Sequence, residues 1–178
     1  MTFCPSSYTL RGPIILKDKF GSPFLIRLYQ KEKGDYVPLK EMYQGFEPKE
    51  ATQGLPPRSD CSRERWLKSL LRGGTNLLAI MEEKVVGHAV LLEIEPCRRC
   101  EYLVFVHQDY QNRGIGTALT RVVRDLAEEM GYCQIWLTVE AINFKAIHVY
   151  EKVGFCLVGP REVECEMVIN LKGGDEGP

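Results

Sequence analysis

Hydrophobic residues along the chain repeat with two different spacings, which predict helices and strands. Residues 114–130 carry apolar side chains three and four positions apart, and Gly131 follows where a helix would end. Three earlier runs are rich in β-branched and aromatic residues and are joined by short turns, at Leu77–Met81, Val85–Ile94 and Tyr102–Val106. These runs predict an antiparallel three-strand meander that leads into a long helix.

Further elements are predicted on both sides of this segment. Towards the C-terminus, we expect a strand, a helix and two strands, at Cys133–Val139, Asn143–Val153, Phe155–Val158 and Val163–Ile169. Towards the N-terminus, we expect a two-strand hairpin and two helices, at Pro13–Leu16, Phe24–Tyr29, Tyr36–Tyr43 and 61–72. The segment Gly45–Asp60 contains three prolines and is predicted to be a long loop.

This order of elements predicts one α/β (α+β) domain with a mixed, mainly antiparallel central sheet and flanking helices. We expect the domain to occupy residues 1–171 and a flexible tail to follow at 172–178. The chain has 178 residues, of which 44% are hydrophobic, and this is enough for a single core.

Charge and hydropathy exclude several functional classes. The chain has 23 basic and 24 acidic residues, so no excess of positive charge faces a nucleic acid. No run of about 18 apolar residues is present to cross a membrane. The first fifteen residues lack the basic and apolar regions of a signal peptide. We therefore expect a cytoplasmic protein, monomer or homodimer, with no nucleic acid and no membrane among its partners.

The strongest local signal is a glycine-rich segment between the strand that ends at Val106 and the long helix, and it consists of Gln111, Asn112, Arg113, Gly114, Ile115, Gly116 and Thr117. Backbone amides at such a turn and helix start bind phosphate oxygens. A mononucleotide P-loop is excluded because Thr117-Ala118 replaces its Lys-Ser/Thr pair. A dinucleotide fingerprint fits poorly because Leu119 replaces its third small residue, although Glu140 lies at the distance of its ribose ligand.

A second segment follows the next predicted strand and contains Asn143, Ala146, Tyr150, Gly154 and Phe155. Together the two segments resemble the signatures of the GNAT (Gcn5-related) N-acetyltransferase superfamily, and the resemblance covers about Leu77–Leu171. It implies a GNAT-like acyl-CoA acyltransferase fold with acetyl-CoA as co-substrate and no metal. It also implies acetyl transfer to a primary amine by direct attack in a ternary complex. The acceptor, a small molecule or a protein amine, stays open.

The resemblance assigns roles to individual residues. It implies that the amides of Arg113–Thr117 hold the pyrophosphate. It also implies that a bulge splays Tyr102–Val106 from Cys133–Val139, so that backbone groups near Phe105 and Val106 bind the pantetheine arm. Asn143 and Ala146 would line the channel and Tyr150 would protonate the departing thiolate, since the three share one helical face. The alternatives are that Asn143 only caps its helix and that Tyr150 is a core residue.

The general base is less clear from the sequence. The resemblance places a glutamate at the start of the strand before the glycine-rich segment, at or beside Cys100, so Glu101 is the expected base although it is one residue out of register. Four alternatives remain, namely Glu93, Glu95, Glu140 and a water held by His107.

Two assignments divide the chain by function. Residues 77–171 are expected to form the cofactor-binding core, and residues 1–76 to shape the acceptor site. A non-catalytic acyl-CoA-binding regulatory module of the same fold is the alternative function. Cys97 and Cys100 have the spacing of half a zinc site, but one such pair without further ligands predicts a hairpin turn and no metal.

Overall fold

The computed structural model describes residues 12–47, 55–94 and 98–172, and the order of strands and helices predicted for these segments is confirmed. An eight-stranded sheet has the order β1-β2-β3-β4-β5-β6-β8-β7. Its strands are β1 (Ile14–Lys17), β2 (Pro23–Leu28), β3 (Gly74–Met81), β4 (Lys84–Ile94), β5 (Arg99–Val106), β6 (Gln134–Glu140), β7 (Cys156–Val158) and β8 (Glu164–Asn170). Neighbouring strands are antiparallel except β5 and β6, so the sheet is mixed and mainly antiparallel, as the sequence predicts.

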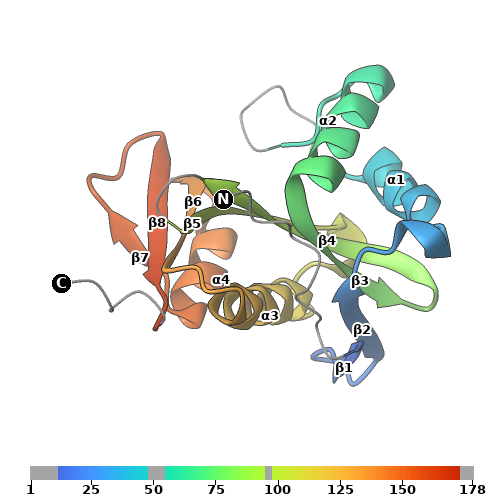
Figure 1. Cartoon of the computed structure of the whole chain (residues 1–178), viewed down its shortest axis with the longest axis horizontal. Coiled ribbons are helices and arrows are strands. Elements are labelled where there is room, and N and C mark those ends of the chain that lie inside the picture. Colours follow the sequence, from blue (N-terminus) through green and yellow to red (C-terminus); the bar gives the residue numbers. More distant parts are fainter. Residues whose placement is uncertain (1–11, 48–54, 95–97, 173–178) are drawn as a thin grey trace.

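The helices of the described residues cover the sheet from both sides (Figure 1). On one side, α1 (Tyr36–Gly45) and α2 (Asp60–Gly73) pack on β3 and β4. On the other side, α3 (Ile115–Glu129) lies beside α4 (Phe144–Val153) and packs on β3, β4 and β5. We call these two sides of the sheet the α1/α2 face and the α3/α4 face. Short 3-10 turns occur at Lys31–Lys33 and Gln108–Tyr110.

Each face has its own hydrophobic core. The core on the α3/α4 face is the larger, and α3 buries Leu119, Val123 and Leu126 in it, at the spacing that predicted this helix. The core on the α1/α2 face includes buried residues from both helices and from β5, namely Leu39, Met42, Tyr43, Leu67 and Phe105. The sheet is therefore held between two apolar layers.

A chain of buried polar groups ties the α1/α2 layer to the sheet. Asn76 donates through Nδ2 to the carbonyls of Leu70 and Gly74, at 3.1 and 2.7 Å. Its Oδ1 is therefore the atom that accepts from Nε2 of His88, at 2.9 Å. The other ring nitrogen, Nδ1, then accepts from the hydroxyl of Tyr43 at 2.7 Å. Burial lowers the pKa of His88 to about 3, so the ring is neutral near pH 7.

Two strands begin three residues earlier than the sequence predicts. β3 starts at Gly74 and not at Leu77, because Gly74 already pairs with Leu92 on β4. A Cβ atom at Gly74 would stand 2.7 Å from the carbonyl oxygen of Leu91. The glycine thus caps the end of α2 and is also required by close packing at the start of β3. β5 starts at Arg99 and not at Tyr102, because its first residues pair with strands on both sides.

Parts of some predictions lie outside the described residues. The predicted loop Gly45–Asp60 includes residues 48–54, and Glu95 and Cys97 belong to another such segment. Of the predicted tail, Lys172 donates its amide to Oε1 of Glu128 at 3.2 Å, and residues 173–178 lie outside the described part.

Candidate active site

β5 and β6 lie side by side over a short distance and then separate. Their parallel partners are Arg99 with Gln134, Cys100 with Ile135, and Glu101 with Trp136. From Tyr102 to Val106, the strand partner of β5 is β4. The predicted separation of these two strands is therefore confirmed, and we call the space between them the β5–β6 gap.

The bulge expected in Tyr102–Val106 is not found there. β5 pairs with β4 without a register shift from Arg99 to Val106. The shift lies one strand further away, where β4 has one extra residue between the partners of Ala79 and Ile80 on β3. A bulge in the β4–β5 ladder therefore does not produce the β5–β6 gap.

Alternate residues of β5 direct their backbone groups into the gap. His107, just after the strand, donates its amide to the carbonyl of Val86 on β4, at 3.0 Å. Because backbone groups alternate sides along a strand, those of Phe105 also face β4 and those of Val104 and Val106 face the gap. Of the two predicted pantetheine contacts, Val106 has its backbone at the gap, whereas Phe105 has a buried ring on the α1/α2 face.

The glycine loop (residues 111–117) joins β5 to α3. Asn112 and Gly114 have left-handed φ values of 59° and 91°, and Gly114 is the N-cap of α3. The amides of the first helical turn have no partner within the helix and point out of its N-terminus, where the helix dipole adds positive potential. Gln111 donates from Nε2 to the carbonyl of Val106 at 3.1 Å and so fixes the loop to the end of β5. The loop thus offers an anion site next to the gap.

A pair of side-chain hydrogen bonds holds the first turn of α3 against β5. The hydroxyls of Tyr102 and Thr120 are 3.0 Å apart, and Thr120 donates to the carbonyl of Gly116 at 2.8 Å. Tyr102 and Thr120 are both buried. The anion site therefore keeps a fixed position relative to the strand that borders the gap.

Helix α4 supplies the second predicted segment. Asn143 caps the helix, because its Oδ1 accepts from the amide of Ala146 at 3.2 Å, and its exposed Nδ2 group still has two donors for a ligand. Tyr150 is buried, with its ring centre 6.3 Å from that of Tyr102 and 5.8 Å from that of Phe155. Among the described residues, its hydroxyl has no recorded hydrogen-bond partner. Burial raises the pKa of Tyr150, so the phenol is protonated near pH 7.

Glu101 lies on the last rung that β5 and β6 share, opposite Trp136. Its neighbours Cys100 and Tyr102 belong to the core on the α3/α4 face, so the carboxylate is on the α1/α2 face. The side chain is half-buried, and burial raises its pKa. Glu101 and Tyr150 thus lie on opposite faces of the sheet, Glu101 on the last rung that β5 and β6 share and Tyr150 against Tyr102, the next residue of β5.

Two of the alternative bases do not join Glu101. Glu93 lies on the opposite face of the sheet, and Glu95 lies outside the described residues. Glu93 pairs directly with Cys100 and so shares the α3/α4 face. Cys100 itself is fully buried, and its burial, with smaller contributions from Cys133 and Glu93, raises the pKa of the thiol to about 12.

The two remaining candidates are on the α1/α2 face. Glu140 is four positions after Trp136 on β6 and therefore shares its face. His107 follows Phe105 by two positions and lies against the end of α1, where a Cβ atom at Gly45 would be 3.0 Å from its Nε2 atom. Glu101, Glu140 and His107 therefore stay open as proton acceptors.

Sequence reasoning missed two side chains that position the site. Gln108 donates to the carbonyl of Gly45 at 2.7 Å and accepts from the amide of Glu47 at 3.0 Å, which ties the end of α1 to the segment before the glycine loop. Asp18, in the β1–β2 turn, binds the Arg113 guanidinium. Neither side chain belongs to a motif, because each contact joins segments far apart in the sequence.

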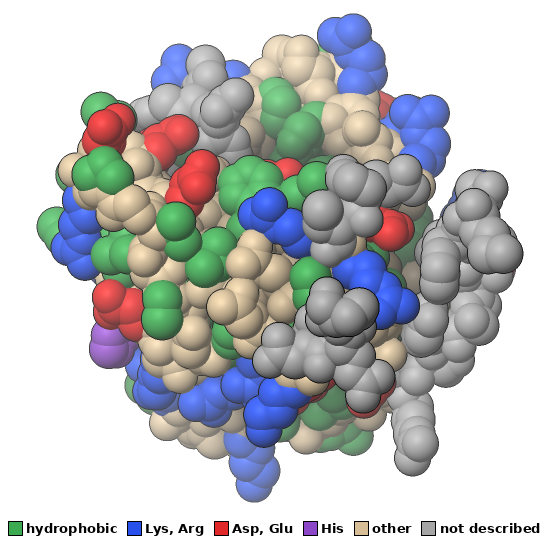
Figure 2. Space-filling view, turned by 60° about the vertical axis from the view of Figure 1, so that its left-hand side comes forward, with side chains coloured by type: hydrophobic (Ala, Val, Ile, Leu, Met, Phe, Trp, Pro, Cys, Tyr) green, Lys and Arg blue, Asp and Glu red, His purple; other side chains and the backbone are tan. Residues whose placement is uncertain are grey.

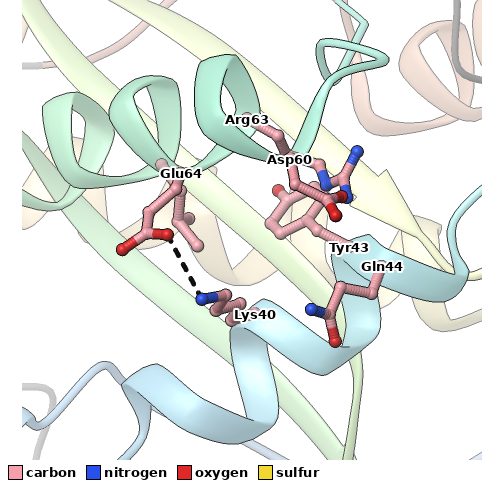
Figure 3. A pocket seen from close by; sticks show the side chains of 7 residues that line it. Lys40, Tyr43, Gln44, Asp60, Arg63 and Glu64 are labelled. Carbon is pink, nitrogen blue, oxygen red and sulfur yellow. Dashed lines mark hydrogen bonds and ion pairs between the residues drawn. The ribbon is translucent and has the colours of Figure 1, made fainter.

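A shallow pocket lies between α1 and α2, away from the gap (Figure 3). It is lined by Lys40, Tyr43, Gln44, Asp60, Arg63, Glu64 and Leu67. Its charges pair with one another, since Lys40 is 3.2 Å from Glu64 and Arg63 contacts Asp60. Hydrogen bonds from Lys68 and Lys40 lower the pKa of Glu64 to about 2. The pocket therefore offers no unpaired charge to a substrate.

Two kinds of feature are absent from the described residues. Within 12–47, 55–94 and 98–172, no three His, Cys, Asp or Glu side chains are grouped as ligands for a metal ion. Over the same ranges, no helix combines the length and the apolar character needed to span a membrane.

Curated relatives match about half of the chain. It is 42% identical over 93 residues to the [ribosomal protein bS18]-alanine N-acetyltransferase of Escherichia coli K12, which covers 52% of the chain and 56% of that protein. It is 33% identical over 86 residues to the spermidine N(1)-acetyltransferase of the same bacterium, which covers 47% of the chain and 45% of that protein. The chain thus spans about half the length of the curated relatives it matches.

Solved structures and a family model cover more of the chain. The GNAT domain of S. lividans PAT superposes with a TM-score of 0.76 at 17% identity, over 92% of this chain and 99% of that one. yncA from Salmonella typhimurium superposes with a TM-score of 0.64 at 18% identity, over 86% and 96%. These similarities show the fold. The model of the acetyltransferase (GNAT) family matches residues 37–155, more than half of the sequence, and the chain belongs to this family.

Proposed function

We propose that the protein transfers an acetyl group from acetyl-CoA to a primary amine by direct attack in a ternary complex. The observation that carries the proposal is that Glu101 and Tyr150 lie on opposite faces of the sheet, next to the point on β5 where β5 and β6 separate. An amine that enters from the α1/α2 face meets a carboxylate, and a thiolate that leaves on the α3/α4 face meets a phenol. The two proton transfers are thus separated by the plane of the sheet.

Acetyl-CoA fits the groups around the gap. The amides of Arg113–Thr117 and the N-terminus of α3 suit its pyrophosphate. The backbone groups of Val104 and Val106, together with the exposed amide of Asn143, suit the amide groups of the pantetheine arm. Ala146 lies between Asn143 and Tyr150 on α4 and offers a small side chain beside that arm. The solved relative yncA was determined with its cofactor acetyl-CoA.

The protein's own residues then handle the protons of the reaction. Acetyl-CoA supplies the thioester carbonyl that the amine nitrogen attacks. Glu101 accepts a proton from the amine, and burial raises its pKa towards the range in which a carboxylate is an effective base. As the carbon–sulfur bond breaks, Tyr150 donates its proton to the sulfur.

The electrostatics of the acceptor side favour a cationic amine. On the α1/α2 face of β6 and β8, Glu140 is directly opposite Glu164, and Glu166 follows two positions later. Like charges at opposed positions destabilise a sheet, and a bound cation relieves the repulsion. Val158 in β7 and Val163 just before β8 are exposed. The face that Figure 2 brings forward shows acidic side chains among hydrophobic ones. The names of the two bacterial relatives, for spermidine and for a ribosomal-protein alanine, both specify amines.

The proposal is tested by incubating the protein with acetyl-CoA and a set of amines and measuring free thiol. Spermidine, a peptide with an N-terminal alanine and a lysine peptide represent the acceptor classes. We expect turnover with at least one cationic amine and its loss in Tyr150→Phe. Tyr36→Phe is the matched control, because it removes a buried tyrosine hydroxyl away from the gap.

Two other outcomes would contradict the proposal. Binding of acetyl-CoA without turnover of any amine would favour the non-catalytic acyl-CoA-binding module. Absence of binding would exclude both functions. The assignment of residues 77–171 to the cofactor and 1–76 to the acceptor stays a prediction, as do the cytoplasmic location and the monomeric or homodimeric state.

A further inference from the structure

We propose that Asp18 is a positioning residue for the glycine loop and acts through Arg113, which makes the β1–β2 turn part of the cofactor site. The inference rests on the proposed function, since it assumes that the loop binds the phosphates of acetyl-CoA. It extends that function to the opening hairpin, which lies outside both motifs and outside residues 37–155 of the family match.

Asp18 is organised to hold a guanidinium. Its side chain is fully buried, and its Oδ1 accepts from the turn amides of Phe20 and Ser22 at 2.9 and 2.8 Å. Its Oδ2 accepts from both Nε and Nη2 of Arg113 at 2.5 Å, across 95 positions of sequence. Burial alone would raise the pKa of Asp18, but the hydrogen bonds from Arg113 and the turn amides outweigh it and hold the pKa below its usual value. The carboxylate is therefore charged, and both of its oxygens accept hydrogen bonds.

The guanidinium of Arg113 is correspondingly bound to the β1–β2 turn. Its guanidinium lies between two rings, 5.6 Å from the centre of Phe20 and 5.6 Å from that of Tyr110. An arginine before the first glycine of a phosphate loop has the charge to bind phosphate directly. Here that charge is paired with Asp18, so phosphate recognition is left to the backbone amides.

A backbone hydrogen bond transmits the contact to the loop. The amide of Lys19 donates to the carbonyl of Arg113 at 3.0 Å. Because the peptide unit between Arg113 and Gly114 is planar and trans, fixing this carbonyl fixes the opposite direction of the Gly114 amide. Asn112 and Gly114 both have left-handed backbones, a conformation that persists only where the surrounding structure holds it. The turn therefore sets the direction of the Gly114 amide, one of the amides of the anion site.

The chain contains a second arginine–aspartate bridge with a buried carboxylate, which serves as an internal control. Arg27 binds Asp35 through Nη1 and Nη2 at 2.5 and 2.7 Å, and Asp35 also accepts from the amide of Gln30 at 2.7 Å. Asp35 is buried and lies just before α1, whereas Asp18 contacts the glycine loop. Loss of either bridge removes a buried charge pair. Only loss of the Asp18 bridge also removes a contact to the glycine loop.

The test uses Asp18→Asn, Arg113→Met, the double variant and Asp35→Asn. Asparagine at 18 still accepts from the turn amides and presents an NH₂ group to Arg113, and methionine keeps the alkyl stem of the arginine. We expect Asp18→Asn and Arg113→Met each to raise the dissociation constant of acetyl-CoA about tenfold in calorimetry, as for loss of one charge-assisted hydrogen-bond pair. The double variant should be no weaker than either single variant, because the two residues act as one unit. Asp35→Asn should lower the thermal midpoint similarly and leave the dissociation constant unchanged.

Several results would overturn the inference. An affinity within twofold of wild type in both single variants would show that the bridge does not position the loop. An equal loss of affinity in Asp35→Asn would show a general effect of stability. Independent, additive losses in the double variant would show that Asp18 does not act through Arg113. If the wild-type protein does not bind acetyl-CoA, the proposed function fails and the inference fails with it, which distinguishes that case from weak binding by the variants only.

Discussion

The two sides of the β5–β6 gap are built from different kinds of groups. On the α3/α4 face, the groups directed at the gap are backbone amides of the glycine loop, a capped helix start and the single hydroxyl of Tyr150. On the α1/α2 face, they are carboxylates on β5 and β6, and the helices of this face are held on the neighbouring β3 and β4 by the buried chain from Tyr43 through His88 to Asn76. The first side depends on backbone geometry and the second on side-chain contacts.

This difference explains why one side is typical of a family and the other is particular to the chain. A backbone site needs glycines and caps at fixed spacing, and it binds the same cofactor whatever the neighbouring side chains are. A side-chain site changes with each substitution, so the acceptor can differ between relatives with one fold. The following predictions test this division of labour.

The largest effect is expected at Tyr150. Replacing Tyr150 with Phe should lower kcat about 100-fold, the usual contribution of a general acid, and leave the dissociation constant of acetyl-CoA nearly unchanged. Steady-state kinetics together with calorimetry measure the two quantities. A fall in affinity with unchanged kcat would instead make Tyr150 a packing residue.

A smaller effect is expected at Glu101. Glu101→Gln should lower kcat about 20-fold and remove the loss of activity at acidic pH that protonation of this carboxylate causes. The factor is smaller than at Tyr150 because Glu140 and His107, on the same face, remain as proton acceptors. Glu93→Gln, on the α3/α4 face, is the matched control and should keep the wild-type pH profile. If Glu93→Gln and not Glu101→Gln alters the profile, the base has been placed on the wrong face.

The glycine loop should respond to the backbone of Gly114. Alanine at this left-handed position costs about 1–2 kcal/mol, which corresponds to about tenfold weaker binding of acetyl-CoA if the loop relaxes to relieve it. Gly131→Ala places the same strain after the other end of α3, where φ is 79°, and should lower stability without changing affinity. Equal affinities in the two variants would show that loop geometry does not determine binding.

The smallest effect concerns the acceptor side and is a pH dependence of stability. The pKa of His88 is about 3 in the folded protein, below the value of about 6.5 expected in the unfolded chain, so the unfolded state binds more protons as the pH falls. The stability that His88 contributes is complete above pH 6.5 and is lost towards pH 3. One such histidine should cost about 0.7 kcal/mol between pH 7 and pH 6.

Urea unfolding at the two pH values measures this loss. In His88→Gln, the side chain can donate to Asn76 and accept from Tyr43 without titrating. The stability that this variant loses between pH 7 and pH 6 should therefore be smaller than in wild type by about 0.7 kcal/mol. An identical pH dependence in the two proteins would mean that the buried chain does not hold a neutral histidine.

The sequence predicted the features that local patterns encode. The order of strands and helices, the glycine loop and the segment from Asn143 to Tyr150 all follow from spacing within a few turns or strands. It did not predict the first residues of β5, because Arg99 and Glu101 are polar and become strand only through pairing with β4 and β6. The position of Glu101 on the last shared rung is a consequence of that pairing.

The missing parts of the site are long-range contacts. Asp18 and Arg113 are 95 positions apart, and Tyr43 and His88 are 45 apart. Each of these residues has an ordinary local context, so no periodicity or motif marks its partner. The expectation of a bulge in Tyr102–Val106 was wrong for a related reason. Strand register depends on both strands of a pair and not on the sequence of one strand.

The central claim is that acetyl-CoA occupies the β5–β6 gap with its phosphates on the glycine loop. Hydrogen exchange with and without saturating acetyl-CoA tests it most directly. The account predicts slower exchange at the amides of residues 113–117 and of Val104 and Val106, and unchanged exchange in α2. Protection confined to other segments, or no protection while acetyl-CoA is bound, would contradict it.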